Sequence, residues 1–128
     1  MPNSSRKHRL AAFKRQQGHC YYCGLPMWLE KPTAFAKKCG ITERESARLQ
    51  CTAEHLVARQ DGGRNSRENI AAACRFCNGT RHRISSPLMP KRYRDHVLRR
   101  LRAGKWHPRS FQHLIVSATG AQSVGITR

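Results

Sequence analysis

Two Cys-x-x-Cys pairs, separated by fifty residues, constrain this chain more than any other feature. The pairs are Cys20/Cys23 and Cys74/Cys77. Two residues between cysteines let both sulfurs reach one ion from a tight turn, and two such turns supply the four thiolates of a tetrahedral zinc site. A redox motif would explain one pair but not two. We therefore expect a structural Zn²⁺ that closes residues 24–73 into a long insertion.

A structural metal ion is consistent with the composition of the chain. Only 38% of the 128 residues are hydrophobic, which predicts a thin core that a metal would support. No secretory leader precedes the basic run at residues 6–9, so we expect a reducing cytoplasm, where paired cysteines bind metal rather than form disulfides. Cys39 and Cys51 are expected to be free buried thiols. A second half-site and a disulfide formed under oxidation are the alternatives for them.

The net charge of +18 at pH 7 calls for a polyanionic partner. Lys and Arg outnumber acids by eight to one in residues 1–40 and by eleven to one in residues 80–128, whereas residues 41–79 carry six against five. This distribution indicates a catalytic or metal-binding centre between two basic arms that grip nucleic acid. No membrane partner is expected, because no apolar run approaches the roughly 20 residues of a membrane span.

Hydrophobic patterning predicts a small, helix-rich α+β protein with a ββα unit at its centre. The first helix should turn Leu10 and Phe13 inward, and the last should bury Met89, Tyr93, Val97 and Leu101. Pro26 and Pro32 predict irregular chain between them and the next helix. The expected helices are Arg6–Gln17, a capping-box helix from Thr42 to Leu49, Arg75–Arg83, and one from Pro87 or Pro90 to Ala103; the strands are Cys51–Val57 and Ile70–Cys74.

The organisation that follows is one domain in three segments. Residues 1–17 form a basic N-terminal helix, residues 18–85 form the zinc-stapled core, and residues 86–128 form a basic C-terminal helix and tail. Trp28, Trp106 and Phe111 are expected in the core. The histidines that lack a supporting motif are expected at the surface or in contact with phosphates; they are His8, His19, His96, His107 and His113.

Residues 51–82 combine several elements that carry chemistry. Glu54-His55 is followed by Gly62-Gly63, then by Asn69 just before a strand, and then by Cys-x-x-Cys with Asn78 directly after it. In this order they closely resemble the HNH endonuclease family, and the upstream cysteine pair extends the resemblance over about residues 18–83. The resemblance implies a ββα-metal (HNH, His-Me finger) core with flanking helices. It also implies metal-dependent hydrolysis of phosphodiester bonds in DNA, by nicking or double-strand cleavage.

The same resemblance assigns roles to individual residues. His55 becomes the general base, and a histidine near its ordinary pKa can accept a proton at neutral pH. Glu54 and Asn78 take positions of catalytic metal ligands, and Glu54 stands where the family usually has Asp or His. His82, one helical turn after Asn78, is a third candidate ligand. Asn69 is expected to hold the loop by hydrogen bonds to the backbone and so to orient His55.

A site built from these oxygen ligands suits Mg²⁺ or Mn²⁺, with Ni²⁺ or Zn²⁺ as alternatives if His82 binds the ion. The ion would stabilise the leaving 3′-oxygen while His55 activates water. Duplex DNA is the expected partner of a monomer or homodimer of bacterial, phage or mobile-element origin. The candidate nucleic-acid contacts are five arginines, two near the proposed site and three on the last helix, namely Arg59, Arg81, Arg92, Arg94 and Arg99.

One alternative function stays open at this point. A non-catalytic zinc-binding protein that binds DNA or RNA would explain the four cysteines and the positive charge equally well. It would not explain why Glu54-His55, Asn69 and Asn78 occur in the order and spacing of a nuclease site.

Overall fold

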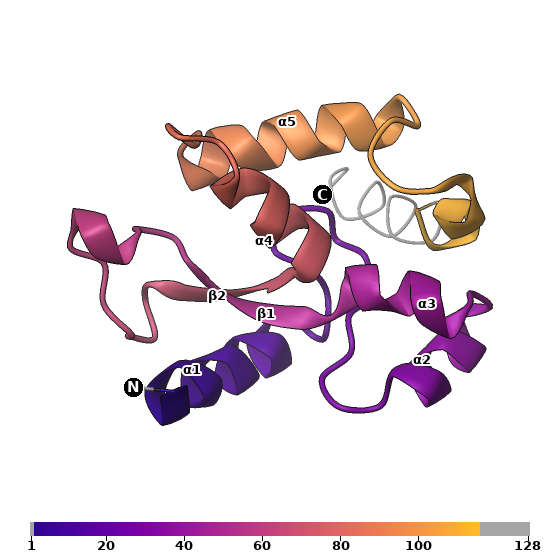
Figure 1. Ribbon diagram of the computed structural model, residues 1–128, viewed down its shortest axis with the longest axis horizontal. Helices are drawn as coiled ribbons and strands as arrows, with labels where there is room; N and C mark the ends of the chain where they lie inside the picture. Colours follow the sequence, from indigo (N-terminus) through magenta and orange to yellow (C-terminus); the bar gives the residue numbers. More distant parts are fainter. Residues whose placement is uncertain (1, 116–128) are drawn as a thin grey trace, which may run out of the picture.

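A two-stranded antiparallel sheet lies at the centre of the computed structural model, which describes residues 2–115. Strand β1 (Cys51–His55) pairs with β2 (Ile70–Cys74) in a continuous register from Cys51↔Cys74 to His55↔Ile70. Helix α4 (Arg75–His82) begins directly after β2 and covers one face of the sheet, while α1 (Pro2–Arg15) covers the other (Figure 1). The predicted α+β class and ββα unit are confirmed, although β1 ends two residues early.

Helix α1 packs on the sheet through small residues. Ala12 is fully buried and Phe13 packs against the core, but Leu10 is 40% exposed. The expectation that Leu10 faces inward is therefore wrong, because two residues of helix turn it about 200° away from Ala12. Just past the helix, the Gln16 amide both donates to the Ala72 carbonyl (2.8 Å) and accepts from the Ala72 N–H (3.0 Å). This pair of bonds fastens the end of α1 to β2.

The segment between the two cysteine pairs contains more helix than predicted. Helix α2 (Pro32–Cys39) begins at Pro32, so the expectation of irregular chain there is wrong. Proline is well tolerated in the first helical turn, where its missing N–H would have no partner inside the helix. The capping box at Thr42 is confirmed: it opens α3 (Glu43–Ser46), which continues as the 3₁₀ turn η1 (Ala47–Leu49).

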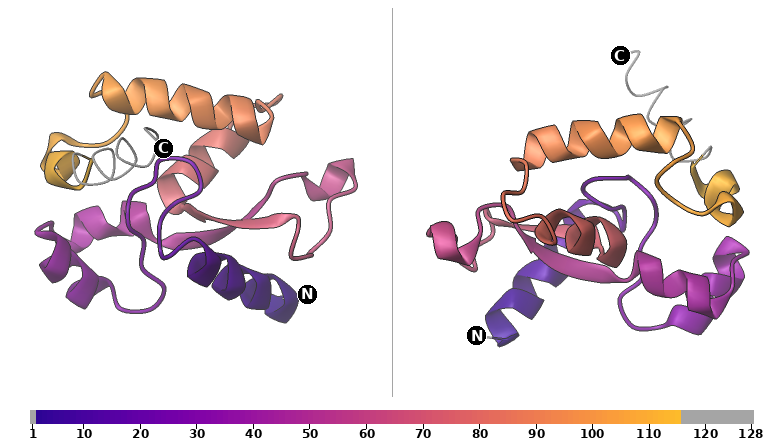
Figure 2. Two further views of the ribbon diagram at one scale, coloured as in Figure 1. Left: turned by 180° about the vertical axis from the view of Figure 1, so that it is seen from behind. Right: turned by 45° about the horizontal axis from the view of Figure 1, so that its top comes forward.

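Helix α5 (Pro90–Arg102) runs across the outer side of α4 (Figure 1). Tyr93, Val97 and Leu101 are buried as predicted, but Met89 precedes the helix and is 67% exposed, so its place in the buried stripe is wrong. After α5 the chain returns through η3 (Arg109–Phe111) toward α2 and α3 (Figure 2). The tail from residue 116 lies outside the described residues, within which no helix is long and apolar enough to span a membrane.

The core gathers around the cysteines. Trp106 and Phe111 are buried as expected, while Trp28 is half-buried against the core. His107 is buried too, and its expected surface position is wrong: its Nδ1 accepts a hydrogen bond from Arg48 Nε (2.9 Å). Burial and the neighbouring Arg48 guanidinium lower the pKa of His107 to about 3, so the imidazole is neutral at physiological pH.

Candidate functional site

The four cysteines of the two pairs meet in one buried cluster. Cys20 and Cys23 lie on the turn after α1, while Cys74 ends β2 and Cys77 lies in the first turn of α4. All four sulfurs lie within 4.8 Å of one another, and all four residues are buried. Four thiolates 2.3 Å from one zinc ion would lie about 3.8 Å apart. The cluster therefore fits a tetrahedral metal with little adjustment.

Hydrogen bonds to sulfur support this fit. Backbone N–H groups of Tyr22 and Cys74 both donate to Cys20 Sγ at 3.3 Å, and the Trp106 indole donates to Cys77 Sγ at 3.3 Å. Burial opposes ionisation of Cys20, but hydrogen bonds from the other three cysteines hold its pKa well below the ordinary value. Such donors stabilise sulfur in the thiolate form that a metal binds. The cysteine cluster can hold a structural metal such as zinc.

The two remaining cysteines stay outside this cluster, and both are free. Cys51 is buried, and burial raises its pKa to about 12, whereas Cys39 is only half-buried. Neither thiol is therefore prepared to bind an ion.

Glu54 lies on β1 at the other end of α4, and its carboxylate is fully engaged. The side chain is 1% exposed. Its Oε2 accepts hydrogen bonds from the Tyr22 hydroxyl (2.8 Å) and from Arg81 Nη1 (3.0 Å), while its Oε1 lies 2.8 Å from His82 Nε2. A buried carboxylate is tolerated only with such partners, so Tyr22, Arg81 and His82 hold it in one orientation.

The pair formed by Glu54 and His82 fits one edge of a metal coordination sphere. Two neighbouring ligands of an octahedral Mg²⁺, each about 2.1 Å from the ion, lie about 3 Å apart. Glu54 Oε1 and His82 Nε2 have nearly this separation at 2.8 Å, and 36% of the His82 side chain is exposed. The His82 side chain is therefore accessible from solvent, whereas an ion would have to displace the His82–Glu54 hydrogen bond to reach the buried Glu54 Oε1. In the part of the chain that the structure describes, the cysteine cluster is the one group of three or more His, Cys, Asp or Glu ligands.

Asn78, the other candidate ligand, is directed elsewhere. Its amide nitrogen donates to Thr52 Oγ1 (3.0 Å) and to the Ala53 carbonyl (3.2 Å). These bonds attach α4 to the middle of β1. The structure thus brings two of the three candidate ligands together and uses the third to join helix and strand.

His55 is the last residue of β1 and contacts the loop that follows. Its Nε2 lies 2.6 Å from Asn65 Oδ1 and 3.4 Å from Arg59 Nε. The strand continues without a bulge between Glu54 and His55, so the two side chains leave it on opposite faces. Among the described residues, no hydrogen bond links His55 to Glu54 or His82.

Asn69 closes the base of the loop between the strands. Its Oδ1 accepts from the Val57 N–H (2.8 Å), and its amide nitrogen donates to the carbonyls of Val57 and Arg64 (both 3.0 Å). Gly62 has a positive φ of 93°, and a Cβ on Gly63 would lie 1.7 Å from the Val57 carbonyl oxygen. The Gly-Gly pair is therefore required for the turn that brings the loop back to Asn69.

The predicted arginine contacts divide into two groups. Arg59, Arg92, Arg94 and Arg99 are exposed. Arg81 is only 4% exposed, and its Nε donates to the Leu88 carbonyl (3.1 Å) while Nη1 binds Glu54. The expected surface position of Arg81 is wrong, because the buried Glu54 carboxylate requires a cation beside it.

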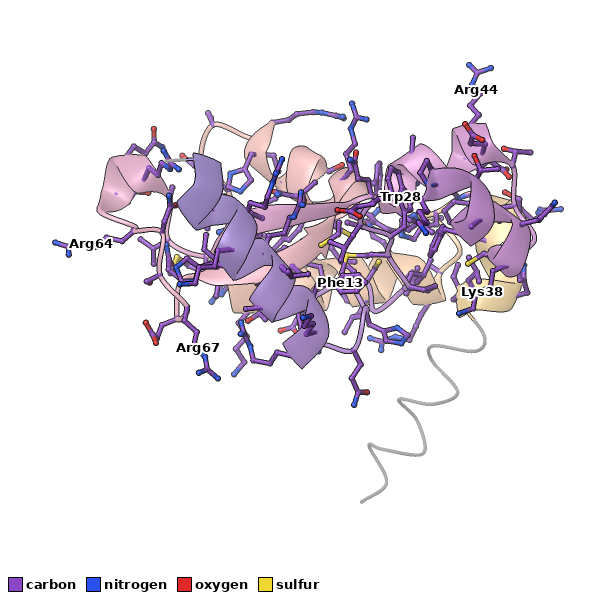
Figure 3. The ribbon with its side chains drawn as sticks, turned by 90° about the horizontal axis from the view of Figure 1, so that it is seen from below. Phe13, Trp28, Lys38, Arg44, Arg64 and Arg67 are labelled. Carbon is purple, nitrogen blue, oxygen red and sulfur yellow. The ribbon has the colours of Figure 1, made fainter. Side chains whose placement is uncertain are left out.

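Sequence reasoning missed several residues at this end of the molecule. Tyr22 lies between the first two cysteines and gave no sign that it would reach Glu54, 32 positions away. Asn65 follows the Gly-Gly turn, and an asparagine there is also typical of an ordinary loop. On the same loop, the exposed Arg64 and Arg67 project outward from the molecule (Figure 3); the three arginines within residues 59–67 were the available signal.

Comparison with protein families identifies one domain in this chain. Residues 37–83 match the family model described as HNH endonuclease. The match includes β1, the loop, β2 and α4, and therefore Glu54, His55, Asn69 and the second cysteine pair. Searches of curated proteins and of solved structures returned no significant match. The resemblance noted in the sequence is confirmed over residues 37–83, which match the HNH endonuclease family model.

Proposed function

We propose that this protein is a metal-dependent endonuclease that hydrolyses phosphodiester bonds in double-stranded DNA. The observation that carries the proposal is the pair of Glu54 Oε1 and His82 Nε2, which lie 2.8 Å apart beside solvent at the end of α4. A divalent ion held there, preferably Mg²⁺ or Mn²⁺, would polarise the phosphate and stabilise the leaving oxygen. Zinc at the cysteine cluster would serve the fold and take no part in the reaction.

His55 acts as the general base in this proposal, and its contacts select the nitrogen that accepts the proton. The short 2.6 Å distance makes Nε2 the donor to Asn65 Oδ1, because an amide oxygen can only accept. The 3.4 Å contact from Arg59 Nε is then too long to compete. Nδ1 consequently keeps its lone pair and is free to take a proton from water.

Asn69 positions the loop that carries Asn65 and Arg59. Its three backbone hydrogen bonds fix both ends of the loop, so the partner of His55 Nε2 stays in place. Asn78 would act first as the link between α4 and β1. It would bind a metal through Oδ1, the amide atom that takes no part in the bonds to Thr52 and Ala53.

DNA binding is proposed to depend on the basic arms. Arg59 lies beside His55, and the exposed Arg92, Arg94 and Arg99 of α5 add positive charge on another face. Contacts of this kind bind phosphates without reading sequence, so affinity should fall steeply with salt.

A single substitution tests whether the protein is a nuclease that uses His55 as its base. His55→Ala protein should bind a supercoiled plasmid as the wild type does and fail to nick it in Mg²⁺ or Mn²⁺. Asn65→Ala is the companion variant, expected to nick more slowly because the His55 ring loses its orienting partner. If His55→Ala nicks at the wild-type rate, the assignment of the base is wrong.

A non-catalytic zinc-bound DNA-binding protein remains the second candidate, and one observation favours it. The Arg81 guanidinium already balances the charge of Glu54 at 3.0 Å, which weakens the attraction of this carboxylate for a cation. Titration of plasmid nicking with Mg²⁺ and Mn²⁺ separates the two functions. The enzyme requires saturable activation, whereas the binding protein would show no cleavage at any concentration.

A further inference from the structure

Exposed hydrophobic side chains gather at one end of this molecule. Five large hydrophobic residues are exposed in the described part of the chain, and four of them lie at Val57 and within residues 84–89, on either side of His82 in the fold. They are Val57, Ile84, Leu88 and Met89; the fifth, Leu10, lies on α1. A protein this basic and this poor in hydrophobic residues gains nothing by exposing them together, so the cluster indicates a contact surface.

Two of these residues, Val57 and Met89, border a hollow that includes the candidate metal ligand His82. One side is formed by the start of the loop, at 56–61, and the other by the connection between α4 and α5, at 85–89, with Arg81 and His82 between them. Both segments project at the same end of the molecule (Figure 1). The volume is about 460 Å³, and Asp61 is its one carboxylate. Val57 and Met89 lie on opposite sides, 45% and 67% exposed.

The walls of the hollow are fixed to the candidate catalytic centre by hydrogen bonds. Val57 is held through its N–H and its carbonyl by Asn69. On the other side, the Leu88 carbonyl accepts from Arg81 Nε at 3.1 Å, and the same guanidinium binds Glu54. The exposed apolar side chains are therefore held at a defined distance from Glu54 and His82.

We propose that Val57 and Met89 form an apolar wedge that contacts the DNA bases next to the phosphate bound at His82. This inference rests on the proposed function and extends it to the bases. A phosphate at His82 brings the adjoining nucleotides to the mouth of the hollow, where the faces of unstacked bases offer apolar surface. Proteins that deform DNA insert methionine, leucine and similar side chains between base steps in this way.

Charge separates DNA from other occupants of the hollow. A second copy of this chain would bring another +18 against the same end of the molecule, which is unfavourable without a polyanion between the copies. DNA supplies negative charge and apolar base surface together. The wedge must unstack bases of an intact duplex, which costs free energy at each step. A duplex that already contains unpaired bases spares most of this cost and should bind more tightly.

The test compares two DNA probes in EDTA, where no cleavage occurs. One is a 30-base-pair duplex of arbitrary sequence, and the other is the same duplex with three central mismatched pairs. Wild-type protein should bind the mismatched duplex about tenfold more tightly, which corresponds to about 1.4 kcal/mol. The double variant Val57→Ser, Met89→Ser should reduce this preference to less than about twofold, with little change in affinity for the intact duplex. Both side chains are exposed, so the fold should be retained.

Leu10→Ser is the matched control, because it removes an equally exposed apolar side chain from α1. It should keep the tenfold preference. The proposal is overturned if the wild type shows no preference, if the double variant keeps the preference, or if light scattering finds a wild-type dimer that the double variant loses. Because binding is measured without cleavage, a failure of the wedge is distinguishable from a failure of the proposed nuclease activity, which only the plasmid assay reports.

Discussion

The two ends of α4 differ in burial, and this contrast underlies the two metal positions that we propose for this small chain. Cys74 and Cys77 belong to the first turn of the helix, where four buried sulfurs surround one point. At the last turn, Glu54 is buried but His82 is 36% exposed and borders a hollow. Structural zinc sites are closed, whereas catalytic metal sites keep an open position. The first turn of α4, the closed end, can hold a structural metal, and in the proposed function the last turn, the open end, exchanges ions and substrate.

The largest effect on stability should come from removing one cysteine of the cluster at the closed end. Cys77→Ser removes one of the four thiolates around which the core is built, so we expect loss of zinc and of the cooperative unfolding transition. Circular dichroism during thermal denaturation measures this, together with the zinc content of the purified protein. Cys39→Ser is the control, because Cys39 is half-buried and outside the cluster. A Cys77→Ser protein that melts like the wild type would contradict the structural role of the cluster.

A substitution at the open end should lower nuclease activity while the protein stays folded. His82→Ala is expected to slow plasmid nicking by about 10²-fold or more, because the ion loses one ligand. The melting temperature should fall only slightly, because Tyr22 and Arg81 still donate hydrogen bonds to the buried Glu54 carboxylate. His8→Ala, on α1, serves as the control and should nick at the wild-type rate. If His82→Ala instead unfolds the protein, the two ends of α4 are not functionally separate.

A smaller effect should reveal the link between the two ends. The Tyr22 hydroxyl, between the first two cysteines, donates to Glu54 at 2.8 Å, and its ring packs edge-on against Tyr93 with centroids 4.8 Å apart. Tyr22→Phe keeps the ring and removes the hydroxyl. We expect about a tenfold loss of Mn²⁺ affinity, measured by electron paramagnetic resonance, with zinc retained. Tyr21→Phe should not change the affinity; an equal loss in both variants would refute the link.

The smallest effect concerns how stability depends on pH through His107, which is buried in the core beside the cysteines. The pKa of His107 is about 3 in the folded chain, against about 6.5 in the unfolded chain. Between these values the unfolded state binds a proton that the folded state does not, so stability must fall as pH falls. The contribution is about 1 kcal/mol between pH 7 and 5.5. His107→Gln, which can still accept from Arg48, should remove this part of the slope in urea denaturation. An unchanged slope would contradict the burial of a neutral His107.

The sequence predicted what depends on neighbouring residues and missed what depends on packing. Strand β2 and the capping box at Thr42 agree with the structure because local spacing and hydrogen bonds define them. The two cysteine pairs were predicted to meet because zinc geometry demands it. The partners of Glu54 were not predicted, since Tyr22 and Arg81 lie 32 and 27 residues away and only the packing of α4 on the sheet brings them together.

The prediction of which helix residues face the core was limited in the same way. Periodicity placed Tyr93, Val97 and Leu101 of α5 correctly, because three buried residues four apart leave little freedom in the rotation of the helix. It failed at Leu10, because α1 packs on the core through Ala12 and Phe13, and this rotation of the helix leaves Leu10 exposed. Arg81 could not be recognised as buried, because its burial depends on a carboxylate from a distant strand.

Metal content measured together with activity tests the central claim most directly. The protein is dialysed against EDTA, its zinc is counted by atomic emission, and plasmid nicking is then assayed before and after addition of Mg²⁺. If zinc is held at the cysteine cluster and an exchangeable ion at Glu54 and His82, about one zinc per chain should be retained. Nicking should be lost after dialysis and restored by Mg²⁺ alone. A protein that loses its zinc and keeps its fold, or that nicks equally well in EDTA, would contradict the division between the two ends of α4.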